Sequence, residues 1–340
     1  MRNYHVCGVG AALVDTEITV SDQELVSFGI DKGLMTLVDE ARHKQLLTLL
    51  QNHLTVSRKA SGGSAANTVI AVSNFGGRAF YSCKVADDDN GRFYLADLAA
   101  AAVDYRINGN LPVGTTGKCL VLITPDAERT MNTFLGVSET LAEDDLAPPA
   151  IADAEYLYIE GYLVTSETGR RAAIAARKIA EAHGTKTALS LSDPGMVAHF
   201  RAGLEDMLGD GVDLLFCNRE EALGWTNTRS LELAAEKMSA VANQFAITLG
   251  ADGALVYDGS ELHKIPPYIV TTVDSNGAGD MFAGALLYGI THGFDFPAAG
   301  RLASIAAATV VSQYGPRLHP DQHHGILETF RHRQDGAGNP

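Results

Sequence analysis

The pattern of hydrophobic and polar residues predicts strands and helices that alternate through most of the chain. Short apolar runs bounded by turn residues are typical of buried strands, and they occur at 4–9, 79–85, 156–159, 187–191, 214–217 and 245–249, with another just before Asp274. Apolar residues at helical spacing cover 93–102, 170–183 and 231–241. Repeated strand–helix units favour a parallel sheet with helices on both faces, which binds ligands at the carboxyl ends of its strands.

Several segments lie outside this alternation. Residues 12–20 have an extended pattern, 38–50 a helical one, and 53–57 resemble a short strand. Residues 118–124 and 130–134 favour a hairpin that turns at Pro125-Asp126. The polar, glycine-containing residues 331–340 are expected to fray.

Composition and charge narrow the function classes. The chain has 340 residues, of which 46% are hydrophobic and 20% charged, and these values are typical of a soluble globular protein. A net charge of −15 argues against a broad nucleic-acid-binding surface, because nucleic acids are polyanions. An anionic substrate would have to be held by local donors and a metal ion.

The cysteines and the apolar runs indicate in which cellular compartment the protein is expected. The four cysteines lie in or beside strand-like runs and form no CxxC pair, so we expect buried thiols in a reducing cytoplasm. The first residues, MRNYHVCGVG, have the pattern of a strand and not of a signal peptide. No uncharged run is long and apolar enough to predict a membrane span. We expect a cytoplasmic protein.

A glycine-rich stretch near the C-terminus carries the strongest chemical signal. Gly277, Ala278 and Gly279 precede Asp280, which opens an apolar helix pattern. Glycines let the backbone approach a ligand closely, and the free N–H groups at the start of a helix form an anion site. A carboxylate there fits a base that removes a proton from a hydroxyl while the amides hold a phosphoryl group. The alternative is that Asp280, or Asn276, only caps the helix.

Two other stretches combine small and polar residues at the start of a predicted helix. Gly62 and Gly63, with Asn67 at the helix start, suit the binding of polyhydroxyl groups, although a tight strand–helix turn would need the same residues. Asn218 and Glu221 follow an apolar strand. They could form a capping box, or Glu221 could orient a hydrated Mg²⁺ ion.

The nucleotide-binding signals exclude two common designs. Thr248, Gly250 and Gly253 end a strand in a loop that suits nucleotide phosphates, yet GTTGK at 114–118 lacks the spacing of a Walker motif. The pair of glycines at 8 and 10 lacks the third glycine of the dinucleotide-binding fingerprint, since position 13 is leucine. We therefore expect ATP to be bound without a P-loop, and an NAD-dependent oxidoreductase is disfavoured.

Four motifs in order carry a resemblance to a known family: GGSAAN (62–67), NREE (218–221), TLGADG (248–253) and DSNGAGD (274–280). With them the sequence resembles the PfkB/ribokinase family of carbohydrate and nucleoside kinases over nearly the whole chain. The resemblance implies an α/β fold, with a three-layer ribokinase-like core, a mostly parallel central sheet and a small β lid. It implies ATP and Mg²⁺ as cofactors, leaves K⁺ open, and implies a small-molecule acceptor rather than nucleic acid or membrane as partner.

The resemblance also implies roles for individual residues. Asp280 matches the family's catalytic base, Gly277, Ala278 and Gly279 match its anion hole, and Arg129 matches a basic residue that closes on the transferring phosphate. Further matches are Asn218, Thr248, Gly250 and Gly253 on the ATP side, Glu221 for Mg²⁺ through water, and Asp15, Gly62, Gly63 and Asn67 for the acceptor's hydroxyls.

The same resemblance suggests how the chain is divided. The core would comprise 1–14, 58–107 and 138–330, and the lid 15–57 and 108–137, followed by a frayed tail at 331–340. The helical segment at 38–50 could cover the lid and leave no sheet with which a partner could pair. We expect a monomer, with a dimer as the alternative.

The acceptor is expected to be a nucleoside, with adenosine phosphorylated to AMP at its 5′-hydroxyl. The stretch IEGYLVTS resembles adenosine kinases and puts Tyr162 against a purine, with Leu13, Phe134 and Leu135 completing an apolar slot. The alternative is a sugar kinase of the ribokinase, fructokinase or 2-keto-3-deoxygluconate kinase type, because GGSAAN and the hairpin sequence are shared with sugar kinases. A ligand-binding protein without turnover is disfavoured, since both the base and the anion hole are present.

Overall fold

The computed structural model describes residues 2–54 and 58–336, and within them the chain forms two sheets. The larger sheet has the strand order β14-β13-β12-β11-β10-β9-β1-β5-β6 and is parallel from β12 to β6. At one edge β13 pairs antiparallel with β12, and β14 pairs antiparallel with β13. Its strands are β1 (Tyr4–Val9), β5 (Ala79–Ser82), β6 (Val103–Tyr105), β9 (Ala154–Glu160), β10 (Lys186–Ser190), β11 (Val212–Asn218), β12 (Ala242–Thr248), β13 (Ala254–Tyr257) and β14 (Leu262–Ile265).

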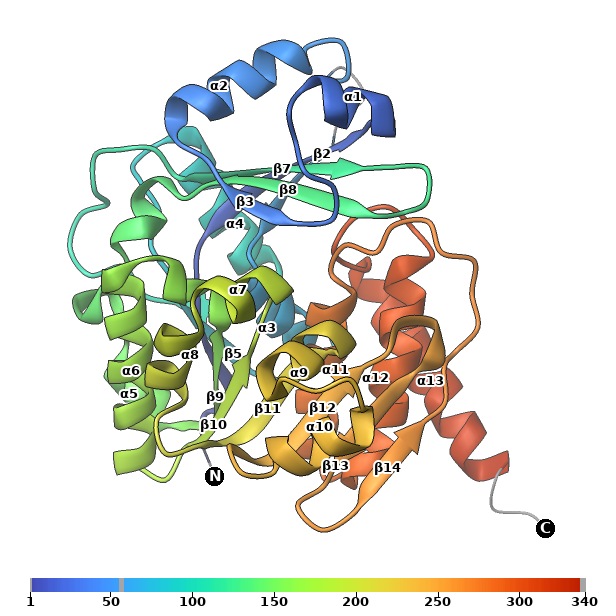
Figure 1. Cartoon of the computed structure of the whole chain (residues 1–340). Helices are drawn as coiled ribbons and strands as arrows, with labels where there is room; N and C mark the ends of the chain where they lie inside the picture. The colour runs from blue at the N-terminus through green and yellow to red at the C-terminus, as the bar shows by residue number, and fades with distance from the viewer. Residues whose placement is uncertain (1, 55–57, 337–340) are drawn as a thin grey trace.

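Helices cover both faces of this sheet, as the repeated strand–helix pattern predicts (Figure 1). On one face lie α3 (Ser64–Asn74), α4 (Asp89–Ala100), α11 (Ala278–Thr291), α12 (Phe296–Val311) and α13 (Pro320–Gly336). On the other lie α5 (Pro148–Ala152), α6 (Glu167–Ala182), α7 (Pro194–His199), α8 (Arg201–Leu208), α9 (Arg219–Thr226) and α10 (Leu231–Met238). Alternate strand residues enter opposite cores, so Tyr156 and Tyr158 of β9 pack on the first face and Leu157 and Ile159 on the second.

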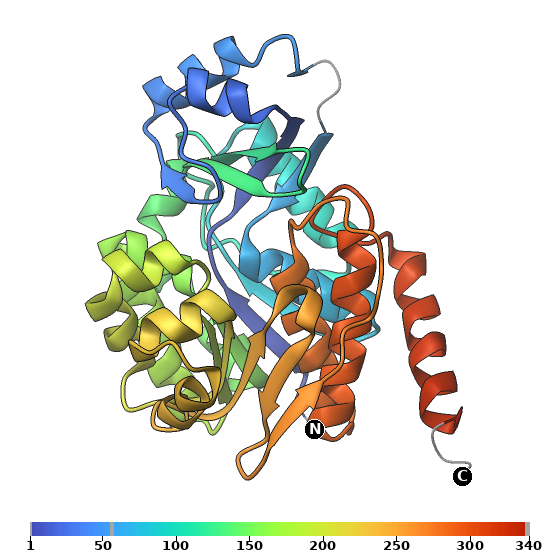
Figure 2. The ribbon, with the colours of Figure 1, turned by 45° about the vertical axis from the view of Figure 1, so that its right-hand side comes forward.

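A second, smaller sheet has the order β3-β8-β7-β2-β4 and stands over one end of the larger sheet (Figure 2). Its strands are β2 (Leu13–Thr19), β3 (Met35–Leu37), β4 (Arg58–Gly62), β7 (Gly117–Ile123) and β8 (Arg129–Phe134). Helices α1 (Asp22–Ser27) and α2 (Glu40–Leu49) cover its outer face through a small apolar cluster that includes Leu25, Leu46 and Leu122. The hairpin predicted at 118–134 is confirmed as β7–β8. The sheet also includes Leu13, Val14 and 58–62, which the resemblance assigns to the core, because β4 pairs with β2 along its length.

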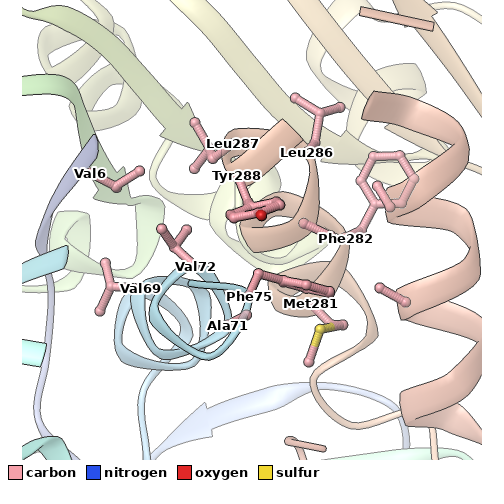
Figure 3. Packing of buried hydrophobic residues seen from close by; sticks show 14 of the residues in the cluster. Val6, Val69, Ala71, Val72, Phe75, Met281, Phe282, Leu286, Leu287 and Tyr288 are labelled. Atoms are coloured by element: carbon pink, nitrogen blue, oxygen red, sulfur yellow. The ribbon is translucent and has the colours of Figure 1, made fainter. Parts of the chain in front are cut away.

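Helix α11 is the buried centre of the first face. Every residue from Met281 to Gly289 is buried, so this part of the helix has no solvent-facing side. Figure 3 shows its residues packed against α3 and β1. A Cβ atom at Gly284 would lie 2.6 Å from the Cβ of Ala71 and 2.7 Å from the backbone oxygen of Thr68. Only glycine therefore allows α3 and α11 to pack this closely, and the contact brings their N-termini together.

Three expectations about elements are wrong. The apolar run before Asp274 is not a strand: Ile269 is 81% exposed, and the edge of the sheet beyond β12 is occupied by the β13–β14 hairpin. Of the strand expected at 53–57, residues 53 and 54 lie in a turn and 55–57 fall outside the described residues. The tail does not fray at 331, because α13 continues to Gly336 from an anchor of buried residues such as Phe330; residues 337–340 are not described.

Two expectations from composition can be compared with the structure. All four cysteines are buried free thiols, as predicted. Within the part of the chain that the structure describes, no helix combines the length and the apolar character needed to cross a membrane.

Candidate active site

A cavity of about 560 Å³ lies between the carboxyl ends of the main-sheet strands and the second sheet. Residues from both sheets line it, including the last residues of β9, β10, β11 and β12. Of the predicted site residues, it is lined by Leu13, Asp15, Gly63, Asn67, Arg129, Leu135, Tyr162, Asn218, Glu221, Thr248, Gly250, Gly277, Ala278, Gly279 and Asp280. Gly62, Phe134 and Gly253 are not among its lining residues.

The glycine-rich stretch forms the turn that opens α11. Gly277 has a φ of 74°, which is left-handed, and a Cβ atom there would collide with the backbone oxygen of Pro316. The helix begins at Ala278, and no side chain caps its N-terminus. Asp280 therefore does not cap the helix. The amides of its first turn remain available to an anion.

The carboxylate of Asp280 is held by two side chains from α3. Ser64 Oγ donates to Oδ1 at 2.7 Å, and Asn67 Nδ2 donates to Oδ2 at 2.8 Å. Burial raises the pKa of Asp280 above its ordinary value, and the donors from Asn67 and Ser64 counteract this rise. Sequence reasoning missed Ser64, although it lies inside the GGSAAN motif. Asn67 does not start its helix, because α3 begins at Ser64 and places Asn67 one turn further on.

Glu160 is a buried acidic residue of the cavity that sequence reasoning missed. It ends β9 and is 1% exposed, and its carboxylate accepts from the backbone N–H of Ala11 at 2.6 Å and of Ala65 at 2.8 Å. Burial raises its pKa to about 7. Glu160 thus ties the loop after β1 to the N-terminus of α3. Its position at the end of an apolar strand was the available signal.

Asp15 lies in β2, where the second sheet faces the cavity. It is 6% exposed, and burial together with the charge of Glu17 raises its pKa to about 8. A Cβ atom at Gly62 would overlap the Asp15 carboxylate. Gly62 therefore makes room for Asp15 instead of lining the cavity itself.

The raised pKa of Asp15 predicts a pH-dependent stability difference. A folded-state pKa of about 8, against an ordinary value of 3.8, means that the contribution of this group to stability is lost as the pH rises between these values. Asp15→Asn stays neutral, so we expect its Tm advantage over the wild type to open above about pH 4 and to reach a few degrees by about pH 8. Thermal unfolding from pH 5 to 9 measures this. Asp89→Asn, whose side chain is 98% exposed, is the control. If the Tm difference between Asp15→Asn and the wild type became smaller towards pH 8, the raised pKa of Asp15 would be contradicted.

Asn218 and Glu221 form a capping box at the start of α9. Glu221 Oε2 accepts from the Asn218 backbone N–H at 3.0 Å, and Asn218 Oδ1 accepts from the Glu221 N–H at 2.9 Å. Glu221 is 3% exposed, and burial raises its pKa to about 8. Among residues 2–54 and 58–336, no cluster of three or more acidic, histidine or cysteine side chains could enclose a metal ion. Mg²⁺ does not require one, since it keeps several waters and binds one or two carboxylates beside phosphates.

The loop after β12 contributes unequally to the cavity. Thr248 and Gly250 line it, whereas Gly253 does not. Gly253 has a φ of 88°, and a Cβ atom there would collide with the backbone at Ile265. Its conformation closes the turn into β13.

The second sheet contacts the loop that precedes α11. Arg129 Nη1 donates to Asn276 Oδ1 at 3.3 Å, and Asn276 Nδ2 donates to Glu17 Oε1 at 3.4 Å. The Ser275 N–H donates to the backbone oxygen of Ala127, at the hairpin tip, at 3.4 Å. These contacts place Arg129, which is partly exposed and lines the cavity, on the same side as the glycine-rich turn at 277–279.

Three of the four residues predicted for the apolar slot line the cavity. Leu13, Leu135 and Tyr162 line the cavity, and the Tyr162 hydroxyl donates to the backbone oxygen of Ser192 at 3.2 Å. Phe134 was wrongly assigned to the slot, because alternate residues of β8 face opposite sides. Met131 and Thr133 face the cavity, whereas the Phe134 ring lies 6.1 Å from that of His43 in α2.

Comparison with known proteins bears on the family and the fold of the chain. The sequence profile described as pfkB family carbohydrate kinase matches residues 28–322. A probable sugar kinase from Rhizobium etli CFN 42 is 34% identical, with a TM-score of 0.90 and coverage of 97% of this chain and 99% of that one. Adenosine kinase from Sinorhizobium meliloti is 33% identical, with a TM-score of 0.91 and coverage of 96% and 99%. Adenosine kinase 1 of Arabidopsis thaliana is 25% identical over 332 residues, or 91% of this chain and 94% of the relative.

The family match covers most of the chain, and the fold agrees with solved members over nearly its full length. The ribokinase-like α/β fold predicted from the sequence is therefore confirmed, and with it a kinase that uses ATP and phosphorylates a nucleoside or a sugar. The chain belongs to the pfkB family of carbohydrate kinases.

Proposed function

We propose that this kinase transfers the γ-phosphoryl group of ATP to the 5′-hydroxyl of a nucleoside, and that the nucleoside is adenosine. One observation carries the proposal. The Asp280 carboxylate, held by Ser64 and Asn67, lies beside the uncapped N-terminus of α11 in a cavity that Tyr162 also lines. A base, an anion site and an aromatic surface therefore share one cavity.

The chemical step follows from these positions. Asp280 accepts the proton of the acceptor hydroxyl, the hydroxyl oxygen bonds to the γ-phosphorus, and the bond from that phosphorus to the β–γ bridging oxygen breaks to release ADP. Phosphoryl transfer is loose, so an ordinary carboxylate suffices as a base and most of the catalysis is positioning and charge stabilisation. The amides at Gly277, Ala278 and Gly279 would bind the phosphoryl oxygens as negative charge shifts onto the leaving group.

Arg129 and Glu221 would complete the phosphate side. Arg129 lines the cavity from the hairpin of the second sheet and would pair with the transferring group. Glu221, with Asn218, would orient hydrated Mg²⁺, which neutralises phosphate charge when bound. Thr248 and Gly250 line the cavity beyond them and would contact the nucleotide.

The acceptor side combines hydroxyl partners with apolar surface. Asp15 and the backbone at Gly63 line one part of the cavity and would hold the ribose hydroxyls. Leu13, Leu135 and Tyr162 would hold the purine, because a flat ring gains from aromatic and aliphatic contacts. The second sheet, with α1 and α2, would close over the acceptor as a lid and exclude water from ATP. We infer a monomer, since α1 and α2 cover the outer face of that sheet.

A sugar kinase is the second candidate, favoured by the 34% identity to the probable sugar kinase from Rhizobium etli CFN 42. An ADP-release assay tests both candidates with adenosine, inosine, guanosine, ribose, fructose and 2-keto-3-deoxygluconate. The proposal requires adenosine to give the highest kcat/KM. A higher value for ribose, fructose or 2-keto-3-deoxygluconate would overturn it.

Tyr162→Ala distinguishes the two acceptor classes. If adenosine is the acceptor, loss of the ring should raise its KM by up to about 100-fold, or roughly 3 kcal/mol, with little change in kcat. Tyr162→Phe is the matched control, because it removes only the hydroxyl that contacts Ser192. An unchanged adenosine KM in Tyr162→Ala would show that the purine does not contact this ring.

A further inference from the structure

We propose that Arg317, which is remote in sequence from every motif of the site, positions Asp280 for proton removal by fixing the side-chain amide of Asn67. The inference rests on the proposed function, in which Asp280 is the base. Arg317 would act through Asn67 and is therefore a positioning residue.

A continuous chain of hydrogen bonds links the three side chains. Arg317 Nε donates to Asn67 Oδ1 at 2.7 Å, and Asn67 Nδ2 donates to Asp280 Oδ2 at 2.8 Å. Asn67 is only 5% exposed, and these two hydrogen bonds satisfy both ends of its buried amide. The side chain predicted to contact the acceptor thus contacts the base directly.

Hydrogen-bonding chemistry allows only one orientation of the amide. The guanidinium of Arg317 has donors and no acceptor, so the atom of Asn67 that faces it must be the oxygen. An ionised Asp280 has acceptors and no donor, so the atom that faces it must be the NH₂ group. If the amide were flipped, its NH₂ group would face the donors of Arg317 and its oxygen would face the acceptor oxygen of Asp280. Arg317 therefore stabilises the orientation in which Asn67 donates to the base.

Arg317 is itself held rigidly. Its Nη1 donates to Asp97 Oδ2 at 2.7 Å and to Ser61 Oγ at 3.0 Å, and its Nη2 donates to the backbone oxygen of Ser61. Asp97 lies in α4 and Ser61 in β4, so the guanidinium is fixed from two elements. A lysine could not make these contacts together, because they use the planar fork of arginine.

The charges around Asp280 set the sign of the electrostatic effect. Arg317 and Arg129 both lower the pKa of Asp280, as do the donors from Asn67 and Ser64. Other ionisable groups that act on this site are Asp15 of β2 and Glu160, Tyr158 and Tyr162 on or after β9. Loss of Arg317 removes a cation and releases the Asn67 amide, so it should raise the pKa of the base. The acidic limb of the kcat–pH profile should then move to higher pH, because only ionised Asp280 accepts a proton.

A double-mutant cycle tests whether Arg317 acts through Asn67. We would measure kcat and KM for adenosine and ATP in the wild type, Arg317→Met, Asn67→Ala and the double variant, each from pH 5 to 9. Arg317→Met should lower kcat at least about tenfold in the wild-type background, since small displacements of a catalytic group are costly. In the Asn67→Ala background the same change should lower kcat less than about threefold, because the Asn67 amide through which Arg317 acts is absent.

The controls separate positioning from a general loss of structure. Arg92→Met removes an exposed arginine from α4, the helix that carries Asp97, and should leave kcat and the pH profile unchanged. Tm and circular dichroism report the folded fraction. If Arg317→Met does not fold, Arg317→Lys, which keeps the charge and loses the fork, is used in the same cycle.

The outcomes distinguish this inference from the proposed function. Asp280→Asn is assayed in parallel, and if it keeps its kcat then both the base and the positioning role are wrong. If Asp280→Asn is inactive but Arg317→Met costs the same factor in both backgrounds, with no shift of the acidic limb, Arg317 is only structural. A cost confined to the background that retains Asn67, together with the shift, supports the positioning role.

Discussion

Replacing Asp280 with asparagine is expected to lower kcat by about 10²–10⁴-fold while leaving the fold and ATP affinity nearly unchanged. The substitution keeps the size of the side chain but removes its capacity to accept the acceptor's proton. Ser64 can still donate to an asparagine oxygen at this position, so the N-terminus of α11 should stay in place.

The measurements are kcat by ADP release and ATP affinity by calorimetry. Asp89→Asn is the control, because its side chain is exposed on α4 away from the cavity. A loss of kcat below about tenfold would contradict the role of Asp280 as general base.

Replacing Arg129 with methionine is expected to lower kcat by about 10²–10³-fold, the range seen when one donor to developing charge is removed. Arg129 lines the cavity beside the glycine-rich turn at 277–279 and contacts Asn276 there. Methionine keeps much of the aliphatic stem, so the hairpin should keep its packing while the charge is lost.

Arg129→Lys separates charge from geometry, since lysine restores the charge without the planar fork. We expect it to recover part of the lost kcat. Thermal unfolding and the exposed-site variant Arg92→Met control for nonspecific effects. A kcat for Arg129→Met within about fivefold of the wild type would mean that Arg129 does not contact the transferring group.

The glycine-rich turn that opens α11 could be predicted because its conformation is local. A left-handed φ at Gly277 and the free amides of α11 depend on a few adjacent residues. The capping box at Asn218 and Glu221 was predictable for the same reason, since both partners lie within one helical turn.

The sequence predicts which residues of a strand share a face, but not which face lines the cavity. Alternation shows that Phe134 and Leu135 point to opposite sides, but it does not say which side faces the cavity. Helix α2 decides this by covering the outer face of the second sheet, where the Phe134 ring meets His43. Leu135 is thereby left to line the cavity.

The sequence by itself determined the fold class, the order of the motifs and the residues of the turn that opens α11, because these follow from hydrophobic periodicity and local backbone chemistry. Only the tertiary structure decided what surrounds Asp280. Ser64 and Asn67 contact Asp280 because α3 packs on α11 at Gly284, and Arg317 contacts Asn67 because the loop before α13 returns to the same point. Such contacts join residues about two hundred or more positions apart, and no local pattern encodes them because they arise only when separate helices and loops pack together.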